Sequence, residues 1–321
     1  MASALFQQNV IALVWDFDKT LIRGYMQAPL FRRYGVDEGR FWREVEGLPS
    51  HYAGQGLDRV SKDTMYLNHL LSYARAGVFE GLSNAGLREL GAELEFFPGL
   101  PECFARLQSF VEGNPNWRPY ELKLEHYIVS TGLRQIILGS AIAPFVEDVW
   151  ANEFVQDSPG PGYLDQPFEA TGSQISALGY VIDNTTKTRA VFEINKGVNK
   201  EPTIDVNSYI VEDDRRVPFR NMVYIADGPS DVPCFSIVRK GGGRTLAVFE
   251  RGKLAEYEQV RRLHDQQRVN YFVEADYRQD SDADLWLHST VSELAEAIVE
   301  RRKRDLGDKV GNPPRHLSGE G

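Results

Sequence analysis

The sequence predicts an α/β fold with a mostly parallel sheet and helices on both of its faces. Five short apolar runs have the length of buried strands: 10–15, 126–129, 222–226, 245–249 and 271–274. Helical patterns lie between several of these runs, and such alternation is typical of parallel sheets because parallel strands need a crossover connection. Three of the runs end in carboxylates or hydroxyls, and in open α/β sheets ligands bind outside the carboxyl ends of the strands.

The first strand, Val10 to Trp15, runs directly into Asp16-Phe17-Asp18. In an extended segment, residues two apart share a face, so both carboxylates lie on one side and Phe17 points into the core. Two like charges this close raise each other's pKa unless a cation or donor compensates, so we expect something positive there. The alternative is that one carboxylate caps the next helix and the other is solvated; the motifs that follow favour the first interpretation.

Residues 24–95 predict a helical insertion. Apolar side chains such as Phe31, Phe41 and Leu70 recur there at helical spacings among charged residues. Charged residues in such a segment are typical of a solvated helix face, although one of them could reach over the site. The candidates for contact with a substrate are Arg23, Tyr25, Arg43 and Arg59, with Lys62 also on this segment.

The second strand end of interest follows a turn at 97–101, an amphipathic helix over 103–110 and a linker at 113–119. A short apolar strand, 126–129, ends there in Ser130, Thr131 and Gly132, and a helix is expected from about 133 to 142. These residues would offer hydroxyls and a backbone N–H at the edge of the sheet.

Residues 149–183 predict short strands and loops, broken by a Pro-Gly run at 159–162. A capped helix is expected from about 185 to 196, with Lys187 in its first turn. A cation is unfavourable against the helix dipole at that position, so we expect Lys187 to have an anionic partner. The polar stretch 199–220 predicts an excursion from the core.

The third strand end is formed by 222–226, which runs into Asp227-Gly228-Pro229-Ser230-Asp231. Beyond it the sequence predicts a strand at 245–249, a helix at 253–267, a strand at 271–274 and a helix at 291–304. Residues 305–321 have little apolar content and predict a mobile tail.

The carboxyl ends of neighbouring parallel strands converge, so these polar groups are expected to meet. Several carboxylates around one point favour a hard cation with oxygen ligands, for which Mg²⁺ is the natural choice. With Mg²⁺ and a lysine balancing the charge, an aspartate can stay ionised, attack phosphorus as a nucleophile and form an aspartyl-phosphate. A carboxylic acid two residues along can protonate the leaving oxygen, while the hydroxyls, the backbone N–H and the lysine hold the phosphoryl oxygens.

Composition limits the class of protein. The chain has 321 residues, of which 42% are hydrophobic, so it can form a large core. Its formal net charge of −10 argues against nucleic acid as a partner. Its two cysteines, Cys103 and Cys234, are far apart and are expected to be buried thiols. We find no secretion signal and no apolar run long enough to span a membrane, so a cytoplasmic protein is expected.

The motifs resemble those of the haloacid dehalogenase (HAD) superfamily. The run Asp16 to Leu21 resembles its DxDxT first motif, and Val129 to Gly132 looks like its second. Lys187 is similar to the third motif and Ala226 to Asp231 to the fourth. Each match is short, but their order and their positions at strand ends make the joint signal strong.

This resemblance implies a Rossmann-like core at 1–23 and 96–304, with the helical segment 24–95 similar to the C1 cap of phosphoserine-phosphatase-like members and 305–321 as a flexible tail. It implies Asp16 as nucleophile and metal ligand, and Asp18 as general acid/base whose backbone carbonyl also binds Mg²⁺. The remaining implied roles are phosphate binding by Thr20, Ser130, Thr131, Gly132 and Lys187, and metal binding by Asp227 and Asp231.

Two departures from the motifs leave alternatives open. Ala226 replaces a glycine that is common before the last motif, a change expected to be neutral. The gap from Lys187 to Asp227 is long, so Lys196 or Lys200 remains an alternative for the phosphate-binding lysine.

The sequence thus predicts a Mg²⁺-dependent phosphatase for a small phosphorylated metabolite. A carboxylic acid at Asp18 favours an ester substrate over dehalogenation, because an ester oxygen needs a proton donor. The alternatives are a phosphotransferase or mutase that uses the same intermediate, and a binding protein for a phosphorylated ligand without turnover. The sequence indicates neither the substrate nor the oligomeric state.

Overall fold

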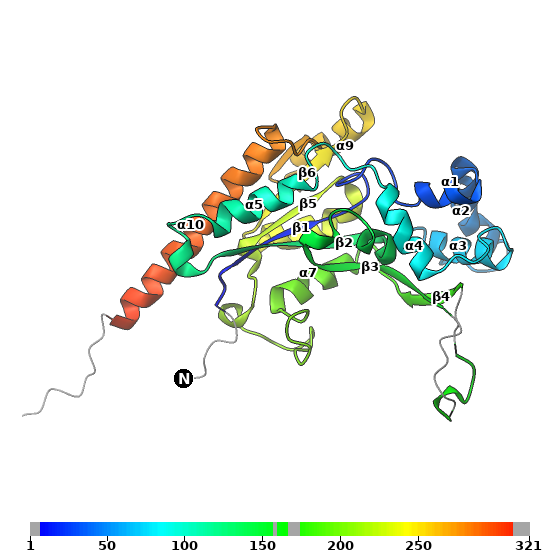
Figure 1. The fold of residues 1–321 in the computed structure, drawn as a ribbon, viewed down its shortest axis with the longest axis horizontal. Helices are drawn as coiled ribbons and strands as arrows, with labels where there is room; N and C mark the ends of the chain where they lie inside the picture. The colour runs from blue at the N-terminus through cyan, green and yellow to red at the C-terminus, as the bar shows by residue number, and fades with distance from the viewer. Residues whose placement is uncertain (1–6, 157–158, 166–173, 311–321) are drawn as a thin grey trace, which may run out of the picture.

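The computed structural model describes residues 7–156, 159–165 and 174–310. Within these residues, seven strands form one sheet in the order β4-β3-β2-β1-β5-β6-β7 (Figure 1). The strands are β1 (Val10–Trp15), β2 (Lys123–Leu133), β3 (Val146–Gln156), β4 (Ile175–Tyr180), β5 (Met222–Ala226), β6 (Arg244–Phe249) and β7 (Tyr271–Glu274). All neighbouring pairs are parallel except β3 with β4. The predicted α/β fold with a mostly parallel sheet is therefore confirmed.

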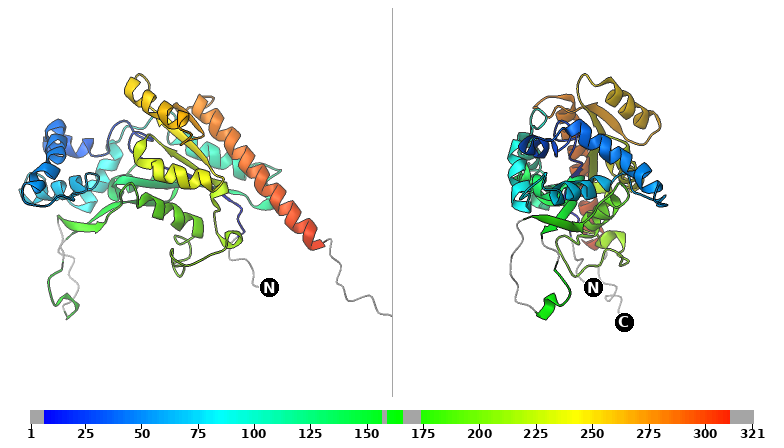
Figure 2. Two further views of the ribbon diagram at one scale, coloured as in Figure 1. Left: turned by 180° about the vertical axis from the view of Figure 1, so that it is seen from behind. Right: turned by 90° about the vertical axis from the view of Figure 1, so that its right-hand side faces the viewer.

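Helices cover both faces of the sheet because the strands are apolar on both sides. Alternate residues of β1 divide between two hydrophobic clusters: Ile11, Leu13 and Trp15 join one, and Val10, Ala12 and Val14 join the other. The first cluster includes side chains of α5 (Glu102–Glu112) and α10 (Asp282–Val310); the second includes side chains of α7 (Lys187–Lys196), α8 (Val232–Lys240) and α9 (Leu254–Asp265). Figure 2 shows these two layers from behind and from the side.

A group of helices, which we call the cap, lies beyond the carboxyl ends of the central strands (Figures 1 and 2). The cap contains α1 (Ala28–Tyr34), α2 (Glu38–Ala53), α3 (Met65–Arg75) and α4 (Asn84–Leu90), all within the segment for which helices were expected. The chain segments that lead into and out of the cap lie side by side, because Ile22 pairs with Phe96 in an antiparallel bridge. The domain limits at 23/24 and 95/96 stay a prediction.

The antiparallel pair β3 and β4 extends the sheet toward the cap and is hydrogen bonded to it. Gln174 Nε2 donates to the Ala74 carbonyl at 2.8 Å, and the Ile175 N–H donates to the Leu82 carbonyl at 2.8 Å. On the other strand, Asn84 Nδ2 donates to the Phe154 carbonyl at 2.8 Å. The cap is thus attached to the core both through its own chain and through this hairpin.

Several predicted elements differ in extent from the structure. Helix α8 was not expected, and α6 (Arg134–Leu138) is shorter than the helix predicted at 133–142. Helix α10 begins at Asp282 and continues to Val310, so it is longer at both ends than the helix predicted at 291–304. The flexible tail at 305–321 stays a prediction, and 311–321 lie outside the described residues. Short 3₁₀ turns complete the chain: η1 (Gly91–Glu93), η2 (Arg118–Tyr120), η3 (Ala143–Phe145), η4 (Tyr163–Asp165), η5 (Glu212–Asp214), η6 (Phe219–Asn221) and η7 (Pro229–Asp231).

Both cysteines are free and buried, as expected. Within the described ranges, we find no helix with the length and apolar character needed to span a bilayer.

Candidate active site

The candidate site lies where β1, β2 and β5 end. Strand β1 is central, and its last residue, Trp15, is in register with Ile128 of β2 and with Ile225 of β5. The Asp16 N–H donates to the Ile225 carbonyl at 2.9 Å, which continues the ladder one residue past the strand. Parallel pairing in this register brings Asp16 and Asp227 to one edge, so these two predicted residues come from adjacent strand ends.

Three carboxylates gather there. Asp16, Asp227 and Asp231 each have a ligand oxygen within 4.8 Å of the others. Lys187 lies among them, with its Nζ 2.7 Å from Asp16 Oδ1 and 2.7 Å from Asp231 Oδ1. Its side chain is 1% exposed, so a buried ammonium from the first turn of α7 is neutralised by two buried carboxylates. Lys187 therefore has two anionic partners, Asp16 and Asp231, where one was expected.

The 3₁₀ turn at Pro229–Asp231 aims the Asp231 carboxylate inward. Besides Lys187, its Oδ1 accepts a hydrogen bond from the Tyr224 hydroxyl at 2.6 Å. Its Oδ2 accepts one from the Ser230 hydroxyl at 2.7 Å. With no exposed surface and three polar contacts, Asp231 is held in one orientation behind the other two carboxylates.

Burial and crowding shift the charges of this cluster. Burial raises the pKa of Asp16 to about 6, against the lowering effect of Lys187. Burial and the neighbouring Asp16 carboxylate raise the pKa of Asp227 well above its ordinary value. Burial alone would lower the pKa of Lys187, but Asp16 and Asp231 outweigh it, and the net pKa of the lysine is raised. The cluster therefore has an excess of negative charge that a further cation would relieve.

Asp18 lies apart from the three-carboxylate cluster. Its Oδ1 accepts a hydrogen bond from the Met26 N–H at 2.9 Å, at the beginning of the cap. Burial, and next the Asp16 charge, raise the pKa of Asp18 to about 8. At neutral pH this carboxyl group therefore carries a proton that it can donate.

The carboxyl end of β2, which includes Ser130, Thr131 and Gly132, is held from both sides. The Ser130 hydroxyl accepts a hydrogen bond from the Gly132 N–H at 3.0 Å, and Ser130 is 1% exposed. A Cβ at position 132 would lie 2.0 Å from Met26 Cε, so any larger residue there would make the Met26 side chain shift. The Thr131 carbonyl accepts from Tyr66 of α3 at 2.6 Å and from Asn152 of β3 at 2.5 Å.

The other predicted residues have different surroundings. Thr20 is fully buried, and its hydroxyl is 3.3 Å from Asp16 Oδ2, so it supports the carboxylate that was expected to be the nucleophile. Lys196 donates to the Val206 and Ser208 carbonyls, and Lys200 pairs with Glu147. Since both make their contacts elsewhere, Lys187 is the lysine at the candidate site.

Sequence reasoning missed the residues that support the site from other elements. Tyr66, Gln27 and Met26 belong to the cap segment, and no local pattern distinguishes them from its other residues. Tyr224 precedes Asp227, and the sequence indicates for it only a position in the third strand. Among the rim candidates, Tyr25 packs on Trp42 with ring centroids 5.5 Å apart, while the Arg23 guanidinium lies 5.9 Å from the centroid of the Phe97 ring.

The donor set fits a hard divalent cation. All three clustered groups are carboxylates, which Mg²⁺ prefers, and the raised pKa values of Asp16 and Asp227 reflect charge that a metal would stabilise. The same oxygens and Lys187 together form a cluster of mixed charge.

The chain is similar in fold to proteins of known structure. No family model matches the chain. An uncharacterized protein of Borreliella burgdorferi is 41% identical over 286 residues, which cover 88% of this chain and 96% of that protein. The crystal structure of a probable phosphoserine phosphatase from Vibrio cholerae superposes with a TM-score of 0.50 at 14% identity, covering 92% of this chain and 68% of that one. A HAD family hydrolase from Salmonella enterica serovar Typhi gives a TM-score of 0.48 at 11% identity, covering 87% and 73%.

Proposed function

Since the chain belongs to the same family as the Borreliella protein and has the phosphoserine-phosphatase-like fold of the HAD superfamily, we propose that it is a phosphatase for small phosphate monoesters. The observation that carries this proposal is the ammonium of Lys187 held between Asp16 and Asp231, with Asp227 beside them. These four ionisable side chains come from three segments that are far apart in sequence, and such clustering is typical of a functional site.

Asp16, Asp227 and Asp231 would hold Mg²⁺, with the Asp18 carbonyl as a further candidate ligand. When bound, Mg²⁺ supplies positive charge that stabilises the phosphoryl oxygens and lowers repulsion toward the nucleophile. Lys187, at the start of α7, and the residues Ser130 to Gly132 at the end of β2 would bind the remaining phosphoryl oxygens.

The chemical steps fall to two aspartates. An Asp16 carboxylate oxygen attacks phosphorus, the ester P–O bond breaks, and the leaving oxygen takes its proton from Asp18. Water then attacks the phosphorus of the aspartyl-phosphate, Asp18 takes a proton from that water, and Asp16 and inorganic phosphate are released. The Met26 N–H contact keeps the Asp18 carboxyl apart from the carboxylate cluster, where it can reach the leaving group.

The direct test is Asp16→Asn, assayed with 4-nitrophenyl phosphate and Mg²⁺. Removal of the nucleophile should reduce kcat by several orders of magnitude. The control is Asp213→Asn in the exposed turn at Glu212–Asp214, which should keep wild-type activity. Wild-type turnover by the Asp16 variant would end the proposal.

Two other functions remain separable by experiment. Transfer of the phosphoryl group to an added sugar or nucleoside hydroxyl, rather than release of free phosphate, would identify a phosphotransferase or mutase. A non-catalytic binder would release no phosphate, either with Mg²⁺ or with a chelator. A small phosphorylated metabolite in the cytoplasm is the expected substrate, and the two buried free thiols agree with a reducing compartment.

A further inference from the structure

Gln27 is a buried amide at the base of the cap. It lies directly before α1, and 2% of its surface is exposed. The preceding residue, Met26, donates its N–H to Asp18. Among the described residues, Gln27 Oε1 has no hydrogen-bond partner. Because a buried carbonyl is normally paired, its position indicates a donor that is supplied from outside the chain.

The neighbours of Gln27 place it next to the proposed chemistry. Its side chain interacts with the Tyr66 hydroxyl, and the Asp18 charge acts on that same hydroxyl. Tyr66 itself donates to the Thr131 carbonyl and accepts from Asn152 Nδ2 at 3.2 Å. The Tyr66 hydroxyl is therefore already paired, and the unpaired acceptor of this group is Gln27 Oε1.

The inference rests on the proposed phosphatase function, which fixes the direction of the substrate. If Asp16 and the end of β2 at Ser130 hold the phosphoryl group and Asp18 protonates the ester oxygen, the rest of the substrate extends from that oxygen. Groups beside Asp18 and Thr131 on the cap side then contact the leaving group. We call Gln27, Tyr66 and Trp42 the leaving-group wall.

This wall is uncharged and partly aromatic. The Trp42 ring lies 5.8 Å from the Tyr66 ring, and Tyr25 continues the aromatic surface outward. The Lys19 ammonium lies over Tyr25, 4.6 Å from its centroid, where Asp227 and Glu256 balance its charge. Flat rings suit the apolar face of a sugar ring, and a lone carbonyl acceptor suits a hydroxyl. None of the three side chains of the wall carries a charge that would pair with the ammonium or carboxylate group of an amino acid.

We propose that Gln27 Oε1 accepts a hydrogen bond from a hydroxyl of the leaving group, so that the leaving-group wall selects phosphate esters of uncharged sugars or polyols. Despite the fold that it shares with phosphoserine phosphatases, this protein would then discriminate against O-phosphoserine.

The experiment measures kcat/KM of the full chain with Mg²⁺ for glucose 6-phosphate, glycerol 3-phosphate, O-phospho-L-serine, phosphoethanolamine and 4-nitrophenyl phosphate. The wild type should prefer the first two over O-phosphoserine by about tenfold or more. Gln27→Met keeps the length and apolar volume of the side chain but removes the acceptor. This variant should lower the ratio of kcat/KM for glucose 6-phosphate to kcat/KM for 4-nitrophenyl phosphate about 10- to 100-fold.

A second variant and a control separate recognition from folding. Gln27→Glu should raise the ratio of kcat/KM for phosphoethanolamine to kcat/KM for glycerol 3-phosphate, because the new carboxylate attracts the ammonium group of phosphoethanolamine. Gln55→Met changes an exposed amide next to α2 and should keep the wild-type ratios.

The possible outcomes are distinct. A wild-type preference for O-phosphoserine, or unchanged ratios in both Gln27 variants, would overturn the inference while leaving a phosphatase. If the wild type hydrolyses none of the five esters, the proposed function fails and the inference fails with it.

Discussion

At the scale of single residues, Tyr224 illustrates how a residue without its own chemistry can tune the site. Its hydroxyl is 2.6 Å from Asp231 Oδ1, and its side chain is fully buried in β5. Partners that orient a metal-binding carboxylate contribute to metal affinity although they do not touch the ion.

We therefore predict that Tyr224→Phe lowers the affinity for Mg²⁺ about 10- to 100-fold. The check is the Mg²⁺ concentration that gives half-maximal hydrolysis of 4-nitrophenyl phosphate, together with calorimetric titration of Mg²⁺ without substrate. Tyr209→Phe, at a side chain with 89% exposure, is the matched control and should leave both values unchanged. An unshifted titration in the Tyr224 variant would mean that Asp231 needs no such support.

Residues of the candidate site were predictable where they follow a strand directly. Asp16 and Asp227 were found because an apolar run ends in a carboxylate, and Lys187 because a cation in the first turn of a helix needs a partner. Tyr66 and Gln27 were not, because their roles arise only when the cap meets β2 and Asp18. Such contacts join segments far apart in sequence and leave no periodic signal.

At the scale of elements, close backbone contact joins the last cap helix to the core. A Cβ at Gly139, which ends α6, would lie 1.7 Å from the Arg88 carbonyl oxygen of α4. A Cβ at Gly91 would lie 2.3 Å from the Ile136 carbonyl oxygen of α6. Two glycines thus allow α4 and α6 to approach without side chains between them.

We predict that Gly139→Ala lowers the free energy of unfolding by about 1–3 kcal/mol, because the obstacle is backbone and has no rotamer that gives way. Urea unfolding followed by tryptophan fluorescence provides the measurement. Gly47→Ala is the control: position 47 lies exposed within α2 with open space around its Cα. It should be neutral or stabilising by up to about 1 kcal/mol, since alanine favours the helix. Equal stability of the two variants would contradict the close contact.

The extents of elements were predictable only where one environment covers the whole element. Each of the strands β1, β5 and β7 has the same kind of surroundings along its whole length. Their predicted limits agree with those in the structure. Strand β3 pairs with β2 at one end and with β4 at the other, so its side chains meet two environments and its alternation is weak. The hairpin that holds the cap was therefore expected only as short strands and loops.

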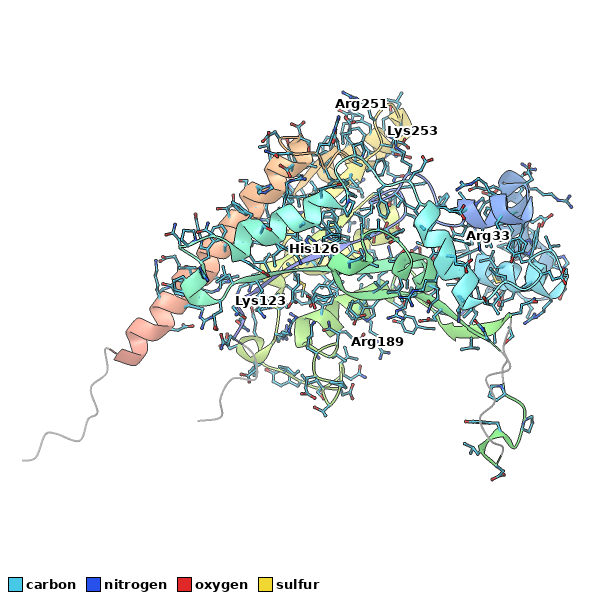
Figure 3. All side chains as sticks on the ribbon, viewed as in Figure 1. Arg33, Lys123, His126, Arg189, Arg251 and Lys253 are labelled. Carbon is cyan, nitrogen blue, oxygen red and sulfur yellow. The ribbon has the colours of Figure 1, made fainter. Side chains whose placement is uncertain are left out.

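At the scale of the whole molecule, the stability should depend on pH through His126, which lies in the interior of the sheet region (Figure 3). Trp15 Nε1 donates to its Nδ1 at 3.1 Å, so the proton is on Nε2, which faces the Phe104 carbonyl at 3.2 Å. The Phe104 ring stacks on it with centroids 4.1 Å apart. Burial lowers the pKa of His126 to about 3.

Because histidine in an unfolded chain titrates near 6.5, the unfolded state binds an extra proton below that pH. Above about pH 6.5, His126 is neutral in both states and costs no stability. Between about pH 6.5 and pH 3, the free energy of unfolding falls by up to about 1.4 kcal/mol per pH unit. Urea unfolding at pH 7 and pH 5.5 measures this loss. His126→Gln keeps a donor and an acceptor and should reduce the slope, whereas His51→Gln, in an exposed part of the cap, should keep it. An identical slope in all three proteins would assign the loss to other groups.

The overall architecture was the most predictable level. When strands and helices alternate along the chain, parallel pairing requires crossover connections, and few topologies satisfy this requirement. In these topologies helices cover both faces of the sheet. The position of the cap over the carboxyl ends was implied only by resemblance. Its attachment to the β3 and β4 hairpin depends on contacts of Ala74 and Leu82 that no sequence pattern announces.

The bridge between Ile22 and Phe96 has a consequence for protein engineering. Since the two ends of the cap leave the core as neighbouring strands about 5 Å apart, the cap is a module with adjacent termini. A foreign domain whose ends are equally close could be transplanted between them while the register of β1, β2 and β5 is preserved. The transplant would keep the candidate site and exchange the surface above it, provided that the donor also supplies backbone carbonyls for Gln174 and Ile175.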